Sequence, residues 1–247
     1  MKMNSVGQLI AAGKKAGKKI FAVLIDPEKT EKLSELLRIA KQDPPDLFLL
    51  GGSAHETPHL SFALEQLRSI GVPVVLFPGH PSQIDPDADA LLLLSLISGR
   101  NADHLIGQHV NAAMTLKKSK LEIIPTGYIL VDGGKKSSTA SFTNTEHLDR
   151  KNISEIVATA LAAEQLGMQL IYLEAGSGAP EAIPVSLIEQ VRREISIPII
   201  VGGGIRNATQ MRERFAAGAD LVVVGNILEH DPSLLLSFVS ATPVLPI

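Results

Sequence analysis

The sequence predicts an α/β fold in which eight parallel strands close into a barrel surrounded by helices. Its recurring unit is an apolar run of about five residues, then a polar or glycine-rich turn, then a segment with helical periodicity. This alternation is typical of parallel strands joined by crossover helices. Eight such units in 247 residues suit an undivided (β/α)8 barrel, so one domain over residues 1–247 is expected. An open doubly wound sheet is the alternative.

The expected strands are the apolar runs that end at glycine, proline or a polar residue. They cover residues 20–25, 46–50, 73–77, 88–94, 123–131, 170–173, 198–201 and 221–224. Helical periodicity predicts helices over residues 30–41, 58–70, 103–114, 153–166, 185–195 and 208–216. Residues 132–144 are expected to form a polar loop, and the tail 242–247 to pack on the outside.

The unit after the third strand is incomplete. Only ten residues separate Phe77 from Ala88, where the next strand begins, and three of them are prolines at Pro78, Pro81 and Pro86. Proline removes a helical hydrogen bond and clashes with the preceding turn inside a helix. The sequence therefore predicts a modified TIM barrel whose third helix is missing or stunted.

Glycine-rich turns end the last three strands, within IYLEAGSG, IIVGGGI and LVVVGN. Glycine lets backbone N–H groups approach an anion, and the helix after each turn points its positive end at the same place. The turns after strands seven and eight form the usual phosphate site of such barrels. A single turn of this kind would equally serve only to join a strand to a helix, but three in succession predict a phosphate cradle.

The composition excludes several classes of protein. The net charge is −3 and the basic residues are scattered, which argues against a nucleic-acid partner. Without cysteine, the chain has neither disulfides nor a thiolate metal site. No signal peptide is recognised, and the apolar runs are too short to span a bilayer. A soluble, cytoplasmic protein is expected.

Asp26 is a candidate metal ligand. It follows an apolar strand and precedes Pro27, so its carboxylate is expected at the barrel mouth. There it could hold Mg²⁺ together with a hydroxyl such as that of Ser53, because magnesium needs only one or two protein ligands besides phosphate oxygens and water. Alternatively, Asp26 caps the helix that follows.

Glu174 is a candidate catalytic carboxylate, because it lies directly before the first glycine turn and could orient or deprotonate a substrate hydroxyl. A structural ion pair or capping contact at the rim is the alternative. Tyr172 is expected on the same face by strand alternation, where it either binds phosphate or fills the barrel. Lys135 and Lys136 lie on the predicted polar loop, either to meet an anion or as solvated surface.

An ordered set of motifs resembles the geranylgeranylglyceryl phosphate synthase family, which includes bacterial heptaprenylglyceryl phosphate synthases. The resemblance covers nearly the whole chain, and that family's modified barrel also lacks the third regular helix. The motifs are LIDPEK at 24–29, GGS at 51–53, FPG at 77–79, GYILVDGGKKSS at 127–138, and then YLEAGSG, VGGGI and VGN. The last two are shared by many phosphate-binding barrels.

The resemblance implies an enzyme that joins sn-glycerol 1-phosphate to geranylgeranyl diphosphate through an ether bond and releases diphosphate with the help of Mg²⁺. It implies that Asp26 and Ser53 hold the metal and that Glu174 orients the glycerol hydroxyl and accepts its proton. The residues implied to bind glycerol 1-phosphate are Tyr172, Leu173, Glu174, Ala175, Gly176, Ser177, Gly178, Gly203, Gly204, Gly225 and Asn226.

The prenyl chain needs an apolar groove, which we expect across the barrel mouth where the third helix is absent, with Phe77 and Tyr128 as candidate lining residues. Such a groove also favours peripheral contact with membrane lipid. Heptaprenyl-specific relatives carry a lysine two residues before the magnesium aspartate, whereas this chain has Leu24, which favours the geranylgeranyl branch. The chain length itself stays open. The family forms dimers and larger assemblies, so a homo-oligomer, dimer or hexamer, is expected.

Other readings of the cradle are a sugar-phosphate isomerase or lyase, with Asp26 and Glu174 as its acid and base, a flavin-binding barrel, and a non-catalytic phosphate-binding scaffold. The motifs of the first and fifth strands count against all three.

Overall fold

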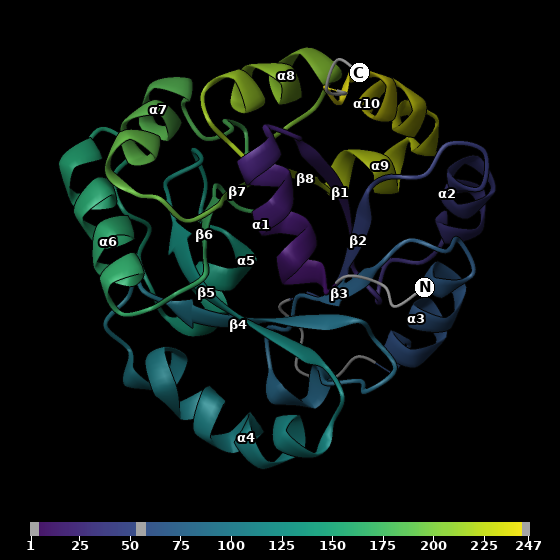
Figure 1. Cartoon of the computed structure of the whole chain (residues 1–247), viewed down its shortest axis with the longest axis horizontal. Helices are drawn as coiled ribbons and strands as arrows, with labels where there is room; N and C mark the ends of the chain where they lie inside the picture. Colours follow the sequence, from purple (N-terminus) through teal and green to yellow (C-terminus); the bar gives the residue numbers. More distant parts are fainter. Residues whose placement is uncertain (1–4, 53–57, 244–247) are drawn as a thin grey trace.

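Eight parallel strands close into a barrel, each paired with the next and β8 with β1 (Figure 1). The structure is a computed structural model that describes residues 5–52 and 58–243. The predicted barrel is confirmed, and the open sheet is wrong. The strands are β1 Ile20–Ile25, β2 Leu47–Leu50, β3 Val74–Leu76, β4 Ala90–Leu96, β5 Glu122–Leu130, β6 Leu170–Glu174, β7 Ile199–Gly202 and β8 Leu221–Val224.

Alternation along the strands divides the core into two layers. In β1, Ile20 and Ala22 belong to the packed barrel interior, whereas Phe21, Val23 and Ile25 belong to the layer between strands and helices. This is the period-two pattern of a strand buried on both faces. The same alternation continues past the end of a strand. It determines which of the following side chains point into the mouth of the barrel.

Six helices were predicted and are present, five of them with shifted ends. They are α2 Leu33–Ala40, α3 Leu60–Arg68, α4 Gln108–Lys118, α6 Ile153–Gln165, α7 Val185–Glu194 and α8 Ala208–Ala216, with a π-helical turn, η2 Asp103–Gly107, leading into α4. They form an outer ring around the strands (Figure 1). Short C-terminal elements were not predicted, namely α9 Asn226–His230, η3 Pro232–Leu234 and α10 Leu235–Ala241. Residues 244–247 of the tail lie outside the described residues.

The prediction of one polar loop over residues 132–144 is wrong in its second half, which forms α5 Ser138–Thr143. Ser137 caps this helix, since its hydroxyl accepts a hydrogen bond from Ala140 N at 3.1 Å. Asn144 ends it in a left-handed conformation with φ of 49°. The N-cap Ser137 and the C-cap Asn144 are local helix signals, but the serine-rich composition of this segment favoured the prediction of a loop.

The third helix is reduced to a single 3₁₀ turn, η1 Pro81–Gln83, between β3 and β4. This confirms the expected modified barrel. The proline-rich connection is too short to cover β4, so one stretch of the barrel wall lacks the helix that covers it elsewhere.

An N-terminal helix, α1 Val6–Ala16, was not predicted. It lies across the middle of the ring of strands (Figure 1) and adds Val6 and Ile10 to the interior of the barrel. Glu122, the first residue of β5, accepts hydrogen bonds from Val6 N at 2.6 Å and Gly7 N at 3.0 Å. Since a helix N-terminus has N–H groups without partners inside the helix, this carboxylate fixes α1 against the N-terminal end of the barrel.

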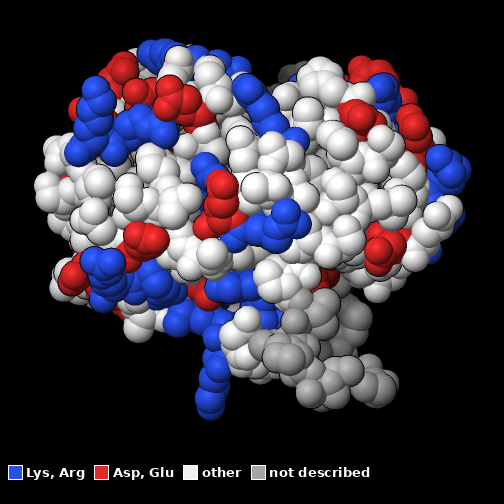
Figure 2. Space-filling model, turned by 90° about the horizontal axis from the view of Figure 1, so that it is seen from above, with Lys and Arg blue, Asp and Glu red and all other residues white. Residues whose placement is uncertain are grey.

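No helix of the described ranges is long and apolar enough to cross a membrane. On the face in Figure 2, basic and acidic side chains are interspersed. The two signs of charge, which nearly balance over the whole chain, are therefore also mixed on that face.

We expect Glu122→Ala to destabilise the fold by about 1–2 kcal/mol, because two N–H groups of α1 lose their acceptor. Urea unfolding followed by circular dichroism measures the change. Glu65→Ala, at an exposed position of α3, is the matched control and should shift stability by less than about 0.5 kcal/mol. Equal stability of the two variants would contradict the anchoring role of Glu122.

Candidate active site

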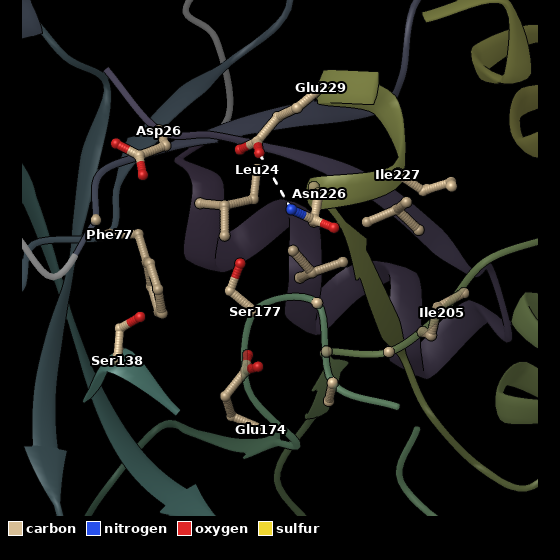
Figure 3. A pocket seen from close by; sticks show the side chains of 18 of the residues that line it. Leu24, Asp26, Phe77, Ser138, Glu174, Ser177, Ile205, Asn226, Ile227 and Glu229 are labelled. Atoms are coloured by element: carbon tan, nitrogen blue, oxygen red, sulfur yellow. Dashed lines mark hydrogen bonds between the residues drawn. The ribbon is translucent and has the colours of Figure 1, made fainter. Parts of the chain in front are cut away.

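A pocket opens at the carboxyl ends of the strands, where barrel sites are built. Asp26 and Glu229 lie on one side of it and Glu174 on the other (Figure 3). Nine of the predicted site residues line it, namely Asp26, Tyr172, Glu174, Ser177, Gly178, Gly203, Gly204, Gly225 and Asn226. The structure thus brings together residues that are spread over 200 positions of the sequence.

Three predicted residues do not line the pocket. The side chains of Leu173 and Ala175 belong to the layer between strands and helices, so only their backbone faces the turn. The amide of Gly176 donates to Glu174 Oε1 at 2.7 Å. Ser53 lies outside the described residues. The part of these four residues in ligand binding stays a prediction.

Close backbone packing shapes the cradle. Gly203 has φ of 82°, and a Cβ there would lie 2.5 Å from Glu174 Oε1 and 2.7 Å from Gly176 N. Any side chain would therefore displace both groups. The turn after β7 is pressed against the turn after β6, which brings the glycine turns to one place, as the sequence predicted.

Glu174 is buried, with 6% of its surface exposed. Burial in the barrel raises the pKa of its carboxyl to about 7, and the hydrogen bond from Gly176 N opposes this shift. The alternative was a structural ion pair or a capping contact. The carboxyl makes no ion pair within the described part of the chain, but it does make a local capping contact with Gly176 N. A carboxyl with this pKa exchanges protons readily near neutral pH and suits acid–base chemistry.

Three aromatic rings stand beside Glu174. The centroids of Tyr172 and Tyr128 are 5.3 Å apart, and Phe77 lies 5.3 Å from the first and 5.7 Å from the second. The Tyr172 hydroxyl is buried and has no hydrogen-bond partner of regular geometry among the described residues, although the Glu174 carboxyl is close by. Burial, with the neighbouring Glu174 carboxyl, raises the pKa of both tyrosines well above the usual value. Tyr172 therefore fills the barrel, as one of the two alternatives expected, and its part in ligand binding stays a prediction.

Asp26 ends the inward-facing series of β1. Its Oδ1 accepts a hydrogen bond from Glu28 N at 3.1 Å, and its Oδ2 lies 3.3 Å from Lys29 Nζ. The alternative that Asp26 caps the next helix is wrong, because α2 begins only at Leu33. The carboxylate closes a local turn and faces the pocket.

Two pocket residues, Lys29 and Glu229, were not assigned from the sequence. Lys29 Nζ lies 3.4 Å from Glu229 Oε2, and Asn226 Nδ2 donates to the same oxygen at 3.4 Å. Burial lowers the pKa of Lys29, but Glu229 and Asp26 together outweigh it and raise that pKa. Two features of the sequence could have assigned them to the pocket. Lys29 ends the motif LIDPEK, and Glu229 lies one helical turn after Asn226.

The mouth suits a magnesium ion shared with substrate. The end of β2 approaches Asp26, since a Cβ on Gly52 would lie 3.1 Å from Asp26 Oδ1. Across residues 5–52 and 58–243, no cluster of three histidine, aspartate or glutamate residues could hold a metal by itself. Mg²⁺ is commonly bound by one or two carboxylates and completed by phosphate oxygens and water. Asp26 is the pocket carboxylate predicted to hold it, and metal binding stays a prediction.

A second, apolar hollow adjoins the pocket where the third helix is missing. It lies between η1, β4 and α4, and Tyr128 and Thr139 line both hollows. Its apolar walls include Ile84, Leu91 and Ala112. An apolar hollow therefore lies where the prenyl groove was expected, and its part in binding a prenyl chain stays a prediction. Of the two candidate lining residues, Tyr128 belongs to it, whereas Phe77 lines the polar pocket.

These features define a (β/α)8 barrel in which a buried carboxyl lies between a cradle of glycine-rich turns and an apolar hollow. The chain belongs to the PcrB family, whose model matches residues 14–242. It is 49% identical over 225 residues to geranylgeranylglyceryl phosphate synthase of Spirosoma linguale, covering 90% of each chain. It is 46% identical to the synthase of the same name from Flavobacterium johnsoniae, covering 93% of this chain and 96% of the relative.

A solved structure gives the same fold. The crystal structure of (S)-3-O-geranylgeranylglyceryl phosphate synthase from Thermoplasma acidophilum in complex with substrate sn-glycerol-1-phosphate superposes with a TM-score of 0.89 at 30% identity. The match covers 97% of this chain and 99% of that one. The family resemblance inferred from the motifs is confirmed.

We expect the buried Glu174 to make stability depend on pH. Its pKa is raised in the folded state, so the folded protein binds more protons than the unfolded chain between about pH 4.5 and 7, and stability falls as pH rises through that window. The loss from this group is about 3 kcal/mol, from the shift of 4.5 to about 7 at roughly 1.4 kcal/mol per pKa unit.

Glu174→Gln removes the titration and keeps an acceptor for Gly176 N. Urea unfolding at pH 5 and pH 8.5 is therefore expected to show the variant gaining stability relative to wild type at the higher pH. An identical difference between the two proteins at both pH values would contradict a raised pKa.

Proposed function

We propose that the protein is a prenyltransferase that forms an ether bond between sn-glycerol 1-phosphate and geranylgeranyl diphosphate and releases diphosphate. The observation that carries the proposal is the junction of two unlike hollows. A glycine-rich cradle holding Glu174 meets an apolar groove at Tyr128 and Thr139. Relatives that cover nearly the whole chain are geranylgeranylglyceryl phosphate synthases.

The cradle would bind the phosphate of glycerol 1-phosphate through the turns at Gly178, Gly203 and Gly225. The glycerol part would then extend toward Glu174 and the neighbouring hydroxyl of Tyr172. Both groups can hydrogen-bond a substrate hydroxyl, and the pKa of about 7 lets Glu174 accept its proton.

In the reaction, the glycerol hydroxyl oxygen bonds to the first carbon of the prenyl chain as the bond from that carbon to diphosphate breaks. The hydroxyl proton passes to Glu174, and the electron pair of the broken bond leaves with diphosphate. Asp26 and Ser53 would hold Mg²⁺, which would neutralise charge on the departing diphosphate. Burial keeps Glu174 away from bulk water, which strengthens its interactions with the substrate.

The groove between η1 and α4 would take the prenyl chain by apolar contact. Leu24 lines the polar pocket where heptaprenyl-specific relatives carry lysine, which supports a geranylgeranyl substrate. The apolar groove counts against a sugar-phosphate isomerase or lyase, because such a substrate has no long apolar part to fill it. Self-association and contact with membrane lipid stay predictions from the resemblance.

Purified protein incubated with glycerol 1-phosphate, labelled geranylgeranyl diphosphate and Mg²⁺ is expected to yield a butanol-soluble phospholipid. Farnesyl and heptaprenyl diphosphates in parallel reactions measure the preferred chain length. The absence of lipid product with every chain length would overturn the proposed function.

We expect Asp26→Asn to lower kcat by about 100-fold or more while the protein stays folded, because the neutral amide is a poor magnesium ligand. The expected signature is a higher Mg²⁺ concentration for half-maximal rate. Asp87→Asn, at an exposed position outside the mouth, is the control. Wild-type turnover and an unchanged Mg²⁺ dependence in Asp26→Asn would refute the assignment.

A further inference from the structure

The loop after β5 is packed directly against the phosphate cradle. A Cβ on Gly133 would lie 2.4 Å from the carbonyl oxygen of Ala175, and Glu181 N donates to Gly133 O at 3.1 Å. On the other side, a Cβ on Gly176 would lie 2.8 Å from Ser137 Cβ. Residues 133–137 therefore sit against the turn after β6 with no space between the two backbones.

This packing places the ammonium group of Lys135 at the edge of the cradle. A Cβ on Gly178 would lie 3.4 Å from Lys135 Nζ and 3.2 Å from Asn226 Oδ1. Gly178 ends the first glycine turn and Asn226 follows the last one, so a single point beside Gly178 is within reach of both ends of the cradle and of this lysine. Lys135 comes from a third, separate loop.

Two acidic residues near this loop pair with other basic residues. Glu181 pairs with Arg150, and Glu146 lies 3.5 Å from Lys136 Nζ. A third, Asp132, accepts a hydrogen bond from Gly134 N at 2.9 Å. Lys135 itself is exposed and makes no ion pair or hydrogen bond within the described ranges. The pocket also contains Arg206 and Lys29, of which Lys29 pairs with Asp26 and Glu229.

We propose that Lys135 is a direct ligand of the phosphate group of glycerol 1-phosphate and closes the open side of the cradle. This inference rests on the proposed function for the identity of the ligand. Backbone N–H groups carry no net charge, so a phosphate dianion held by them needs a counter-charge, and the ammonium group beside Gly178 supplies it together with Arg206 of the same pocket. The proposal assigns Lys135 to this phosphate and not to the prenyl diphosphate, because its ammonium group lies beside Gly178 and Asn226, which are predicted to bind glycerol 1-phosphate.

Lys136 provides a matched control. It is the next residue on the same loop, carries the same charge, is exposed, and pairs with Glu146 instead of facing the cradle. Lys135→Ala and Lys136→Ala change the net charge equally. Any difference in ligand affinity between the two variants therefore reports the position of the lysine and not the net charge of the protein. Lys135→Arg keeps the charge and is expected to retain most of the binding.

Calorimetric titration of the full chain with glycerol 1-phosphate, and separately with inorganic phosphate, measures binding without catalysis. A charge-assisted hydrogen bond predicts binding weaker by about 10- to 100-fold for both ligands in Lys135→Ala, and little change in Lys136→Ala. Steady-state kinetics is expected to show KM for glycerol 1-phosphate rising by a similar factor, with KM for the prenyl diphosphate unchanged.

Equal affinities in the two alanine variants would overturn the proposal, and so would a rise confined to KM for the prenyl diphosphate. These outcomes differ from failure of the proposed function, in which wild-type protein itself makes no lipid product. In that case inorganic phosphate still tests whether Lys135 closes the cradle.

Discussion

The burial of one carboxyl group governs the architecture of the mouth. Glu174 ends β6 on the inward-facing side, and burial there raises its pKa to about 7. Such a group is costly to bury unless it is hydrogen-bonded, and the amide of Gly176 and the hydroxyl of Tyr172 lie beside it. The surrounding turns must then approach closely without side chains, which is why Gly203, packed against this carboxyl, has no room for a Cβ. The cradle and the acid–base group are thus one packed unit.

The modified barrel combines two chemical environments at one opening. A complete third helix would cover β4 as helices cover the barrel elsewhere, and the apolar hollow would be filled by its side chains. The proline-rich connection shortens it to the single turn η1, which leaves Ile84, Leu91 and Ala112 as the walls of a groove. A polar cradle and an apolar groove meet at Tyr128. One polar and one apolar substrate could therefore be held side by side within one site.

Much of this arrangement could be predicted from the sequence because it depends on periodicity and turn chemistry. Apolar runs at fixed spacing gave β1, β8 and α8 with their observed ends, and the prolines after Phe77 predicted the missing helix. The α1 helix escaped prediction because a tertiary contact, the carboxylate of Glu122 on its N-terminus, fixes it against the barrel. The places of Glu229 and Lys135 in the site were not predicted for a related reason, because both depend on how separate loops pack at the mouth.

The buried polar pair of Tyr172 and Glu174 bears on substrate selection. Such a pair penalises any occupant that cannot hydrogen-bond with it, and the penalty is larger than the gain from a matching contact. A phosphate ester with a bare alkyl chain would satisfy the cradle yet leave Tyr172 and Glu174 facing hydrocarbon. The site would therefore discriminate by the hydroxyl groups a ligand carries as well as by its phosphate, and the same polar pair that orients the nucleophile would also exclude molecules that have none.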